Sequence, residues 1–230
     1  VNVLVNNAGV GGIARLAEPT ADGDDLTYRT NFVGHFLLTA QLFTLLARGA
    51  PARVVCLSSV THRSGVTDWA AYRRFVAGRS TYSTSKLAMA GFAAELTRRY
   101  QDRYGITGIA VNPGAVCSDI WFRGQQSPWL AAVMRFVFRL VFLTSEQGAV
   151  TSVSAATDPR WAEAGASGYL APYWTAGPLA PLLEIHGPFA GAQPCRPLAA
   201  VSDVKACRAL FEETRRALGE RLMLSTSLPS

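Results

Sequence analysis

Tyr82 and Lys86 place a phenol and an ammonium group four residues apart in the sequence. On an α-helix, residues i and i+4 lie on one face, so the two groups can share a small pocket. An unperturbed phenol has a pKa of about 10 and is a poor acid or base at neutral pH. A neighbouring cation favours the phenolate and brings that pKa toward the working range. The spacing therefore indicates acid–base chemistry.

Short strands followed by helices must position this pair. Three apolar runs predict strands, at residues 1–5, 53–58 and 106–111. Three longer patterns predict helices, at residues 25–47, 82–100 and 145–156, the last opened by a capping box of Thr144 and Gln147. A further strand is expected at 167–170, and a last helix, capped by Ser202, over about 201–219. The alternation predicts an α/β fold with a doubly wound parallel sheet, Rossmann-like, in a single domain over 1–230.

The composition is that of a globular protein, with 49% hydrophobic and 17% charged residues in a chain of 230. The net charge of +6 comes from scattered arginines rather than from a basic run, which favours a solvated surface over a nucleic-acid partner. The four cysteines show neither CxxC pairing nor a metal-like spacing with histidines, so we expect no metal. Cys56 falls in an apolar strand pattern and is expected to be buried.

The most apolar stretch, residues 129–143, is too short to span a membrane and contains Arg135 and Arg139. The two arginines share one face of the predicted helix, and apolar residues occupy the rest. This pattern suits a lid over an apolar pocket, an interfacial helix that contacts a membrane surface, or an ordinary packed helix.

A polar motif follows each of the three predicted strands. These motifs are Asn6-Asn7-Ala8-Gly9, Ser58-Ser59 and Asn112-Pro113-Gly114-Ala-Val116-Cys-Ser118. Ligands of open α/β sheets bind at the carboxyl ends of the strands, where all three motifs are expected. Together with Tyr82-x-x-x-Lys86, they resemble the short-chain dehydrogenase/reductase family over roughly residues 1–170. Residues 20–23, 30–39 and 58–63 resemble its retinol-dehydrogenase-like branch.

The resemblance implies a role for each motif. Tyr82 would exchange a proton with the substrate oxygen, and Lys86 would lower its pKa and hold the nicotinamide ribose hydroxyls. Ser59 would donate a hydrogen bond to the developing oxyanion, and Asn31 would position a water that relays protons to Lys86. The coenzyme would be NADP or NAD. Its contacts would be Asn7, Ala8 and Gly9 at the adenosine ribose, and Pro113, Gly114, Val116 and Ser118 at the nicotinamide carboxamide. Ser118 stands where the family usually has threonine, which keeps the hydroxyl.

Residues 9–14 formally fit a dinucleotide-binding G-x-G-x-x-G/A fingerprint. Such a fingerprint must open a helix, and Pro19 with the turn residues after it ends any helix there within about one turn. In the family, the glycine-rich phosphate loop precedes the strand at which this chain begins. The resemblance therefore implies an N-terminally incomplete fold, with the strand at 1–5 left as an open edge.

Two functions remain open at this point. The chain is either the catalytic part of an NAD(P)-dependent oxidoreductase acting on a lipophilic, retinoid- or steroid-like alcohol or carbonyl, or a catalytically silent remnant that binds a partner at most. We expect a cytoplasmic or membrane-associated location and allow for a homo-oligomer. The mechanism that the resemblance implies assigns no role to His35 or His62, and both are expected to be structural or exposed. The Pro/Gly-rich residues 171–200 predict an extension.

Overall fold

The computed structural model describes residues 1–11, 18–118, 127–162, 168–172 and 191–219. Four strands pair in parallel, in the order β1 (Val3–Asn6), β2 (Ala52–Leu57), β3 (Ile106–Val111) and β4 (Gly168–Ala171). The short strand β5 (Gln193–Cys195) pairs antiparallel with β4. The α/β class and the parallel core are confirmed, and the antiparallel strand β5 within the predicted extension makes the sheet mixed.

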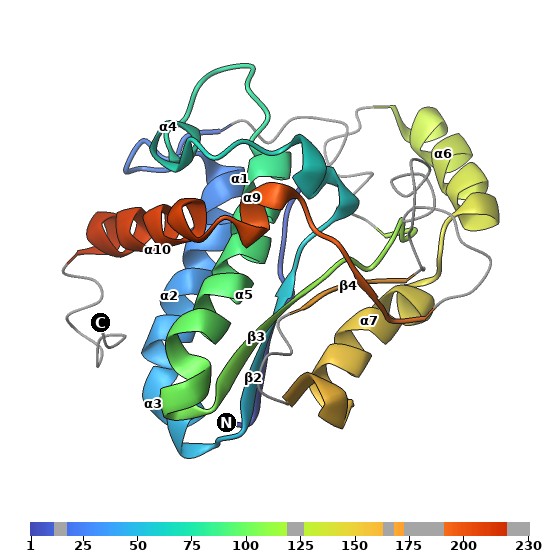
Figure 1. The fold of residues 1–230 in the computed structure, drawn as a ribbon. Coiled ribbons are helices and arrows are strands. Elements are labelled where there is room, and N and C mark those ends of the chain that lie inside the picture. The colour runs from blue at the N-terminus through green and yellow to red at the C-terminus, as the bar shows by residue number, and fades with distance from the viewer. Residues whose placement is uncertain (12–17, 119–126, 163–167, 173–190, 220–230) are drawn as a thin grey trace.

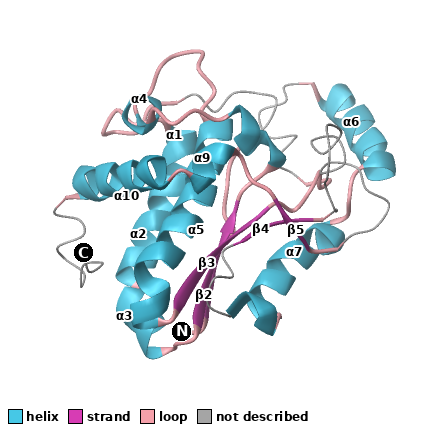
Figure 2. Cartoon of the chain, in the orientation of Figure 1, coloured by secondary structure: helices cyan, strands magenta, loops and turns pink. Residues whose placement is uncertain are grey.

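Helices cover both faces of the sheet (Figure 2). One face carries α1 (Leu26–Tyr28), the π-helical turn η1 (Arg29–Val33), α2 (Gly34–Gln41), α3 (Phe43–Arg48) and α5 (Tyr82–Tyr104). Helix α7 (Ser145–Thr157) lies on the opposite face, followed by the 3₁₀ turn η4 (Pro159–Ala162). Helix α10 (Val204–Leu218), preceded by α9 (Ala199–Ser202), crosses α2 and α5 on the outside (Figure 1).

Alternation along the strands divides the core into two layers. On β2, Val54 and Cys56 point toward the α2–α5 side, whereas Val55 faces α7 together with Ile109 and Val111 of β3. The α2–α5 layer is larger because α10 adds Phe211, whose ring packs at 5.0 Å from that of Phe36. The expected burial of Cys56 is confirmed.

The predicted helix over 25–47 is one helical path with two irregularities. Its hydrogen-bond register widens to a π-helix in η1, and the path breaks at Leu42, where φ is −90° and ψ is 0°. Between β2 and α5, where the sequence predicts an irregular segment, the structure has the 3₁₀ helix η2 (Val60–Ser64) and the short helix α4 (Trp69–Arg73).

The two predicted helix caps have different outcomes. The capping box at Thr144 is present, because its hydroxyl accepts from the Gln147 amide and the Gln147 side chain accepts from the Thr144 amide. The prediction that Ser202 caps the last helix is wrong. Asp203 is the cap, since its carboxylate accepts from the amides of Lys205 and Ala206, and Ser202 instead ends α9.

Strand β1 is the open edge that the sequence predicts. Within the described part of the chain it pairs with β2 alone, and Val1, Val3 and Val5 on its α7 side are exposed. Val150 and Val153 on α7 are exposed as well, and α7 packs beside β1. An apolar surface therefore continues from the strand onto the helix.

Helix α6 (Pro128–Val141) stands at the periphery, beyond α7 (Figure 1). One face is strongly exposed: Trp129 is 74%, Phe136 66% and Leu140 70% accessible. No helix in the described part of the chain is both long and apolar enough to cross a membrane.

Candidate active site

The predicted site residues follow the carboxyl ends of β1, β2 and β3. The register aligns Asn6 with Cys56 and Leu57 with Val111, so the three strands end near one another. The buried Ser58 fixes this edge to α5: its amide donates to Val111 O at 2.7 Å, and its hydroxyl donates to Lys86 O at 2.8 Å. The three loops and the first turns of α5 therefore meet at one side of the sheet.

Tyr82 is the first residue of α5, and neighbouring elements anchor it there. The hydroxyl of Thr81, just before the helix, donates to the carboxylate of Asp25, which also caps α1. Burial raises the pKa of the Tyr82 phenol above its usual 10.0, and a hydrogen bond with the Ser59 hydroxyl opposes that rise. The structure therefore brings Ser59 and Tyr82 together.

Lys86 lies beneath the same loops. It is 5% exposed, and its ammonium group donates to Leu57 O at 3.1 Å. Burial lowers the pKa of Lys86 from 10.5 to about 8. Its Nζ lies 5.7 Å from the centre of the Tyr82 ring, so the cation and the phenol share one environment, as their spacing predicts. The expected lowering of the Tyr82 pKa by this cation is not found, because burial raises that pKa and Ser59 alone opposes the rise.

Asn31 lies in the π-helical turn and reaches both the first loop and α5. Its Oδ1 accepts from the Val10 amide at 2.7 Å, and its Nδ2 donates to Val10 O at 2.9 Å and to Ser85 Oγ at 3.1 Å. A π-helical turn often marks a functional position in a helix. Here the turn directs Asn31 inward to hold the loop after β1.

The glycines of that loop pass directly over the site. A Cβ atom on Gly9 would lie 3.3 Å from Asn31 Oδ1 and 3.5 Å from Lys86 Nζ. A Cβ atom on Gly11 would lie 2.6 Å from ring carbons of Tyr82, too close to be accommodated without movement. Asn7 and Ala8 are exposed before this crossing. Residues 12–14 of the rejected fingerprint lie outside the described residues.

The third loop is fixed mainly by α7. Gly114 has a φ of +81° and its amide donates to the Asn112 side chain at 3.0 Å, which makes the turn that Pro113-Gly114 predicts. A Cβ atom on Gly148 of α7 would lie 2.3 Å from Val116, so the glycine permits this close packing. Ser118 is half-buried farther along.

The expectation for the two histidines was incomplete, because both are buried and bind site loops. His35 Nε2 donates to Ala8 O at 2.7 Å, and His62 Nδ1 lies 2.7 Å from Ser59 O. Position along the helices could have indicated them, since His35 follows Asn31 by four residues and His62 follows Ser59 by three. Two neutral side chains thus hold loop carbonyls.

The arrangement fits the sugar and amide end of a nicotinamide coenzyme. Among the described residues, the ammonium group of Lys86 uses one of its three donors, on Leu57 O, which leaves donors for ribose hydroxyls. Asn112 Nδ2, at the end of β3, is a buried donor with no hydrogen-bond partner among the described residues. Such orphan donors can be satisfied by a ligand.

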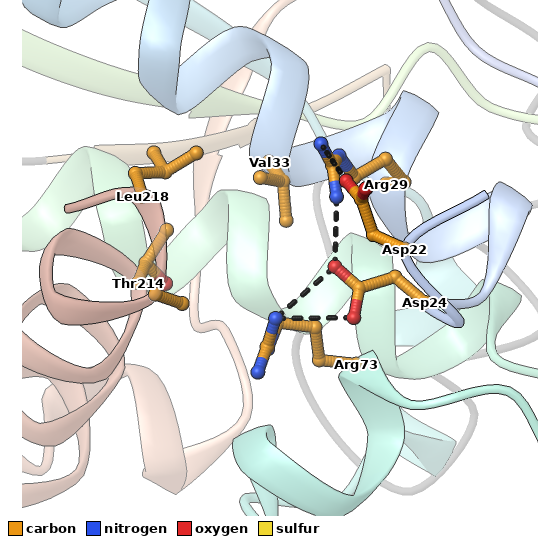
Figure 3. A pocket seen from close by; sticks show the side chains of 8 residues that line it. Asp22, Asp24, Arg29, Val33, Arg73, Thr214 and Leu218 are labelled. Carbon is orange, nitrogen blue, oxygen red and sulfur yellow. Dashed lines mark hydrogen bonds and ion pairs between the residues drawn. The ribbon is translucent and has the colours of Figure 1, made fainter. Parts of the chain in front are cut away.

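A separate cavity of about 210 Å³ lies away from these residues, between the start of α1, α4 and α10. Figure 3 shows the buried Asp24 carboxylate between Arg29 and Arg73, with bonds of 2.8 to 3.1 Å. Arg74 adds a third ion pair to Asp24. The charges are satisfied within the fold, so this cavity is a structural junction.

The family model described as short chain dehydrogenase matches residues 1–127. Among curated proteins, retinol dehydrogenase 12 of Mus musculus is 37% identical over 159 residues, covering 68% of this chain and 48% of the relative. Polyprenol dehydrogenase of Mus musculus is 38% identical over 170 residues, covering 69% of this chain and 48% of the relative. The chain thus spans about half the length of the curated relatives it matches.

Solved structures share the fold. A putative uncharacterized protein from Mycobacterium Paratuberculosis has a TM-score of 0.62 at 24% identity, covering 100% of this chain and 69% of its own. A 4-hydroxyisoleucine dehydrogenase complexed with NADH and succinate has a TM-score of 0.51 at 17% identity, and the match covers 76% of this chain and 69% of that structure's chain. At these identities the likeness concerns architecture alone.

Proposed function

The chain belongs to the short-chain dehydrogenase family, and from that membership we propose that it is the catalytic part of an NAD(P)-dependent oxidoreductase interconverting an alcohol and a carbonyl. The observation that carries the proposal is the convergence of Ser59, Tyr82, Lys86 and Asn31 at one edge of the sheet. A bound nicotinamide coenzyme would supply or accept the hydride.

Tyr82 Oη is the group that gives a proton to the substrate oxygen in reduction and takes it back in oxidation. Ser59 Oγ donates a hydrogen bond to that oxygen as negative charge develops on it. Lys86 binds ribose hydroxyls and adds a positive charge near Tyr82, which favours the phenolate during oxidation. Asn31 holds the loop of Gly9 and Val10 over these groups and, in a complex with coenzyme, would orient a water that reaches Lys86.

The substrate class we propose is a lipophilic alcohol or carbonyl. Two relatives at 37–38% identity are named for retinol and polyprenol, both long apolar alcohols. The chain also carries an exposed apolar face on α6, formed by Trp129, Leu130, Val133, Phe136, Val137 and Leu140. An exposed apolar face suits a protein whose substrate partitions into lipid.

The same face supports a membrane-surface contact. Its exposed residues recur at intervals of three and four, the pattern of a helix lying in a lipid interface. Arg135 and Arg139 lie on the other side of α6, and the sequence between Asp119 and Glu146 contains no acidic residue. We therefore propose that this face contacts an anionic membrane surface, where lipophilic alcohols concentrate.

Product formation tests both the reaction and the substrate class. The 230-residue chain is incubated with NADP⁺ or NAD⁺ and either a long-chain isoprenoid alcohol in micelles or a polar sugar alcohol. We expect carbonyl product from the isoprenoid alcohol, identified by chromatography. Activity confined to the sugar alcohol would overturn the substrate class, and absence of product with every alcohol would favour the alternative, a catalytically silent remnant.

A further inference from the structure

His62 is fully buried at the junction of the site with the C-terminal part of the chain. It belongs to η2, immediately after Ser59, and has no exposed surface. Its ring packs against that of Tyr169 on β4 at 4.8 Å. Both ring nitrogens are within hydrogen-bond distance of a backbone group, one on each side of this junction.

The two backbone partners determine the tautomer. Nδ1 lies 2.7 Å from Ser59 O, a carbonyl that can only accept, so Nδ1 carries the hydrogen. Nε2 lies 3.0 Å from the amide of Leu198, which can only donate, so Nε2 is the bare acceptor. Burial lowers the pKa of His62 to about 4, in agreement with a neutral ring at neutral pH.

Ser59 is therefore held at both ends. Its carbonyl accepts from the His62 amide at 3.0 Å as well as from the imidazole. Its hydroxyl accepts from the Thr61 amide at 3.3 Å and bonds with Tyr82. The two bonds to the carbonyl thus fix the position of the Ser59 backbone, from which the hydroxyl reaches the phenol.

We propose that His62 is a positioning residue for Ser59, and that the amide of Leu198 holds the imidazole in the tautomer which fixes the Ser59 carbonyl. A segment 136 residues away in sequence thus helps to set the oxyanion donor. Arg63 strengthens the same junction by donating to Arg196 O at 2.9 Å. The inference rests on the proposed role of Ser59 in the reaction.

Two conservative variants separate the two bonds of the imidazole. In His62→Asn, the amide nitrogen replaces Nδ1 and keeps the bond to Ser59 O, while the bond from Leu198 is lost. In His62→Gln, the longer side chain reaches the Leu198 amide and the bond to Ser59 O is lost. His62→Phe keeps the ring packing against Tyr169 and loses both bonds.

Trp69→Phe is the matched control. The buried Trp69 indole donates to Ala206 O at 3.2 Å, so the variant also removes one bond between a buried ring and the C-terminal segment, away from Ser59. All variants are compared as full chains by heteronuclear NMR of the imidazole nitrogens, of Ser59 and of the Tyr82 phenol, and by turnover.

In the wild type we expect the NMR pattern of a neutral ring protonated at Nδ1. The Ser59 and Tyr82 signals should move in His62→Gln and His62→Phe, remain near wild type in His62→Asn, and not change in Trp69→Phe. Turnover should fall by up to about 100-fold in His62→Gln and His62→Phe, which is the effect expected of a misplaced catalytic group. The fall should appear in kcat more than in KM.

Equal shifts in His62→Asn and His62→Gln, or an unmoved Tyr82 signal in His62→Phe, would overturn the inference. The NMR signals need no turnover, so the positioning role is decided even if the wild type forms no product. In that case the proposed reaction is contradicted, whereas the NMR spectra still decide whether His62 positions Ser59.

Discussion

Lys86 carries its ammonium group in the interior, where burial lowers its pKa from 10.5 to about 8. Below pH 8 both the folded and the unfolded chain bind this proton, so the folded state bears the full cost of the buried charge. Between pH 8 and 10.5 the unfolded chain binds more protons, and stability rises with pH. The site therefore holds a charge that its fold disfavours, as active sites commonly do.

Lys86→Met should stabilise the chain at neutral pH. The pKa shift corresponds to a destabilisation of the folded state by about 3 kcal/mol, which the substitution relieves. Loss of the hydrogen bond to Leu57 O costs about 1 kcal/mol, so the free energy of unfolding should rise by about 2 kcal/mol. Urea unfolding at pH 7 and near pH 10 measures the difference in free energy of unfolding between Lys86→Met and the wild type. This difference should be smaller at the higher pH. The exposed Lys205, replaced in Lys205→Met, is the control and should change little. A destabilised Lys86→Met would contradict the argument.

Ser59→Ala should raise the pKa of Tyr82 further. Burial already raises this pKa, and the Ser59 hydroxyl is the group that lowers it, so its removal leaves the phenol protonated to higher pH. In alcohol oxidation, which needs the phenolate, the rising limb of the pH–rate profile should shift to higher pH. A limb that stays in place would show that Ser59 does not bond with the phenol.

Residues close in sequence were the predictable part of the site. Tyr82 and Lys86 meet because the helix periodicity brings i and i+4 together, and Ser59 follows a strand with a clear apolar pattern. The second partner of His62, the amide of Leu198, could not be predicted. No local pattern encodes a contact over such a distance.

At the scale of elements, apolar periodicity located the helices but not their hydrogen-bond registers. The predicted helix over 25–47 is helical almost throughout, yet Asn31 depends on the π turn Arg29–Val33. A π turn changes the register by one residue while apolar residues keep an approximate helical spacing. Tertiary contacts of Asn31 with Val10 and Ser85 compensate for the irregular turn.

The start of α10 offers a test of the corrected cap. Asp203→Ala removes the carboxylate that accepts two backbone amides and should cost about 1 kcal/mol of stability. Ser202→Ala changes the neighbouring residue, whose side chain does not cap the helix, and should be near neutral. Thermal unfolding of both variants tests which residue caps α10. A larger loss of stability for Ser202→Ala than for Asp203→Ala would show that Ser202 is the cap.

Helix α6 should bind anionic vesicles through its exposed face. Phe136→Asp and Leu140→Asp each replace a largely exposed apolar side chain and should weaken binding about 10-fold or more. Val153→Asp changes an exposed valine on α7 and is the control. Co-sedimentation with phosphatidylglycerol vesicles measures the effect. An equal loss for Val153→Asp, or no wild-type binding, would contradict the membrane contact.

At the scale of the whole molecule, the strand–helix alternation predicted the parallel order of β1 to β4. It did not predict β5, because Pro194 and its neighbours read as an extension. Proline is tolerated there since β5 pairs, among the residues that the structure describes, with β4 alone. The open edge at β1 agrees with the expectation from the family resemblance, whereas the apolar pattern of the strand on both faces is that of a central strand.

The loop after β1 also bears on coenzyme affinity. The proposed coenzyme contacts lie mainly at the nicotinamide end, and Gly11 rests against the Tyr82 ring. A coenzyme bound at these contacts would have to displace this loop, which would cost binding energy. We therefore expect affinity weaker than micromolar for the chain, so turnover is measured with millimolar coenzyme.

The proton-transfer role of Tyr82 is the central claim, and one comparison tests it directly. Turnover of an isoprenoid alcohol is measured with millimolar coenzyme for the wild type, Tyr82→Phe and the control Tyr100→Phe, whose hydroxyl lies elsewhere on α5. Loss of the phenol should lower kcat by roughly 10²–10⁴-fold in Tyr82→Phe, while Tyr100→Phe stays near wild type. A Tyr82→Phe chain that oxidises the alcohol at the wild-type rate would contradict the account.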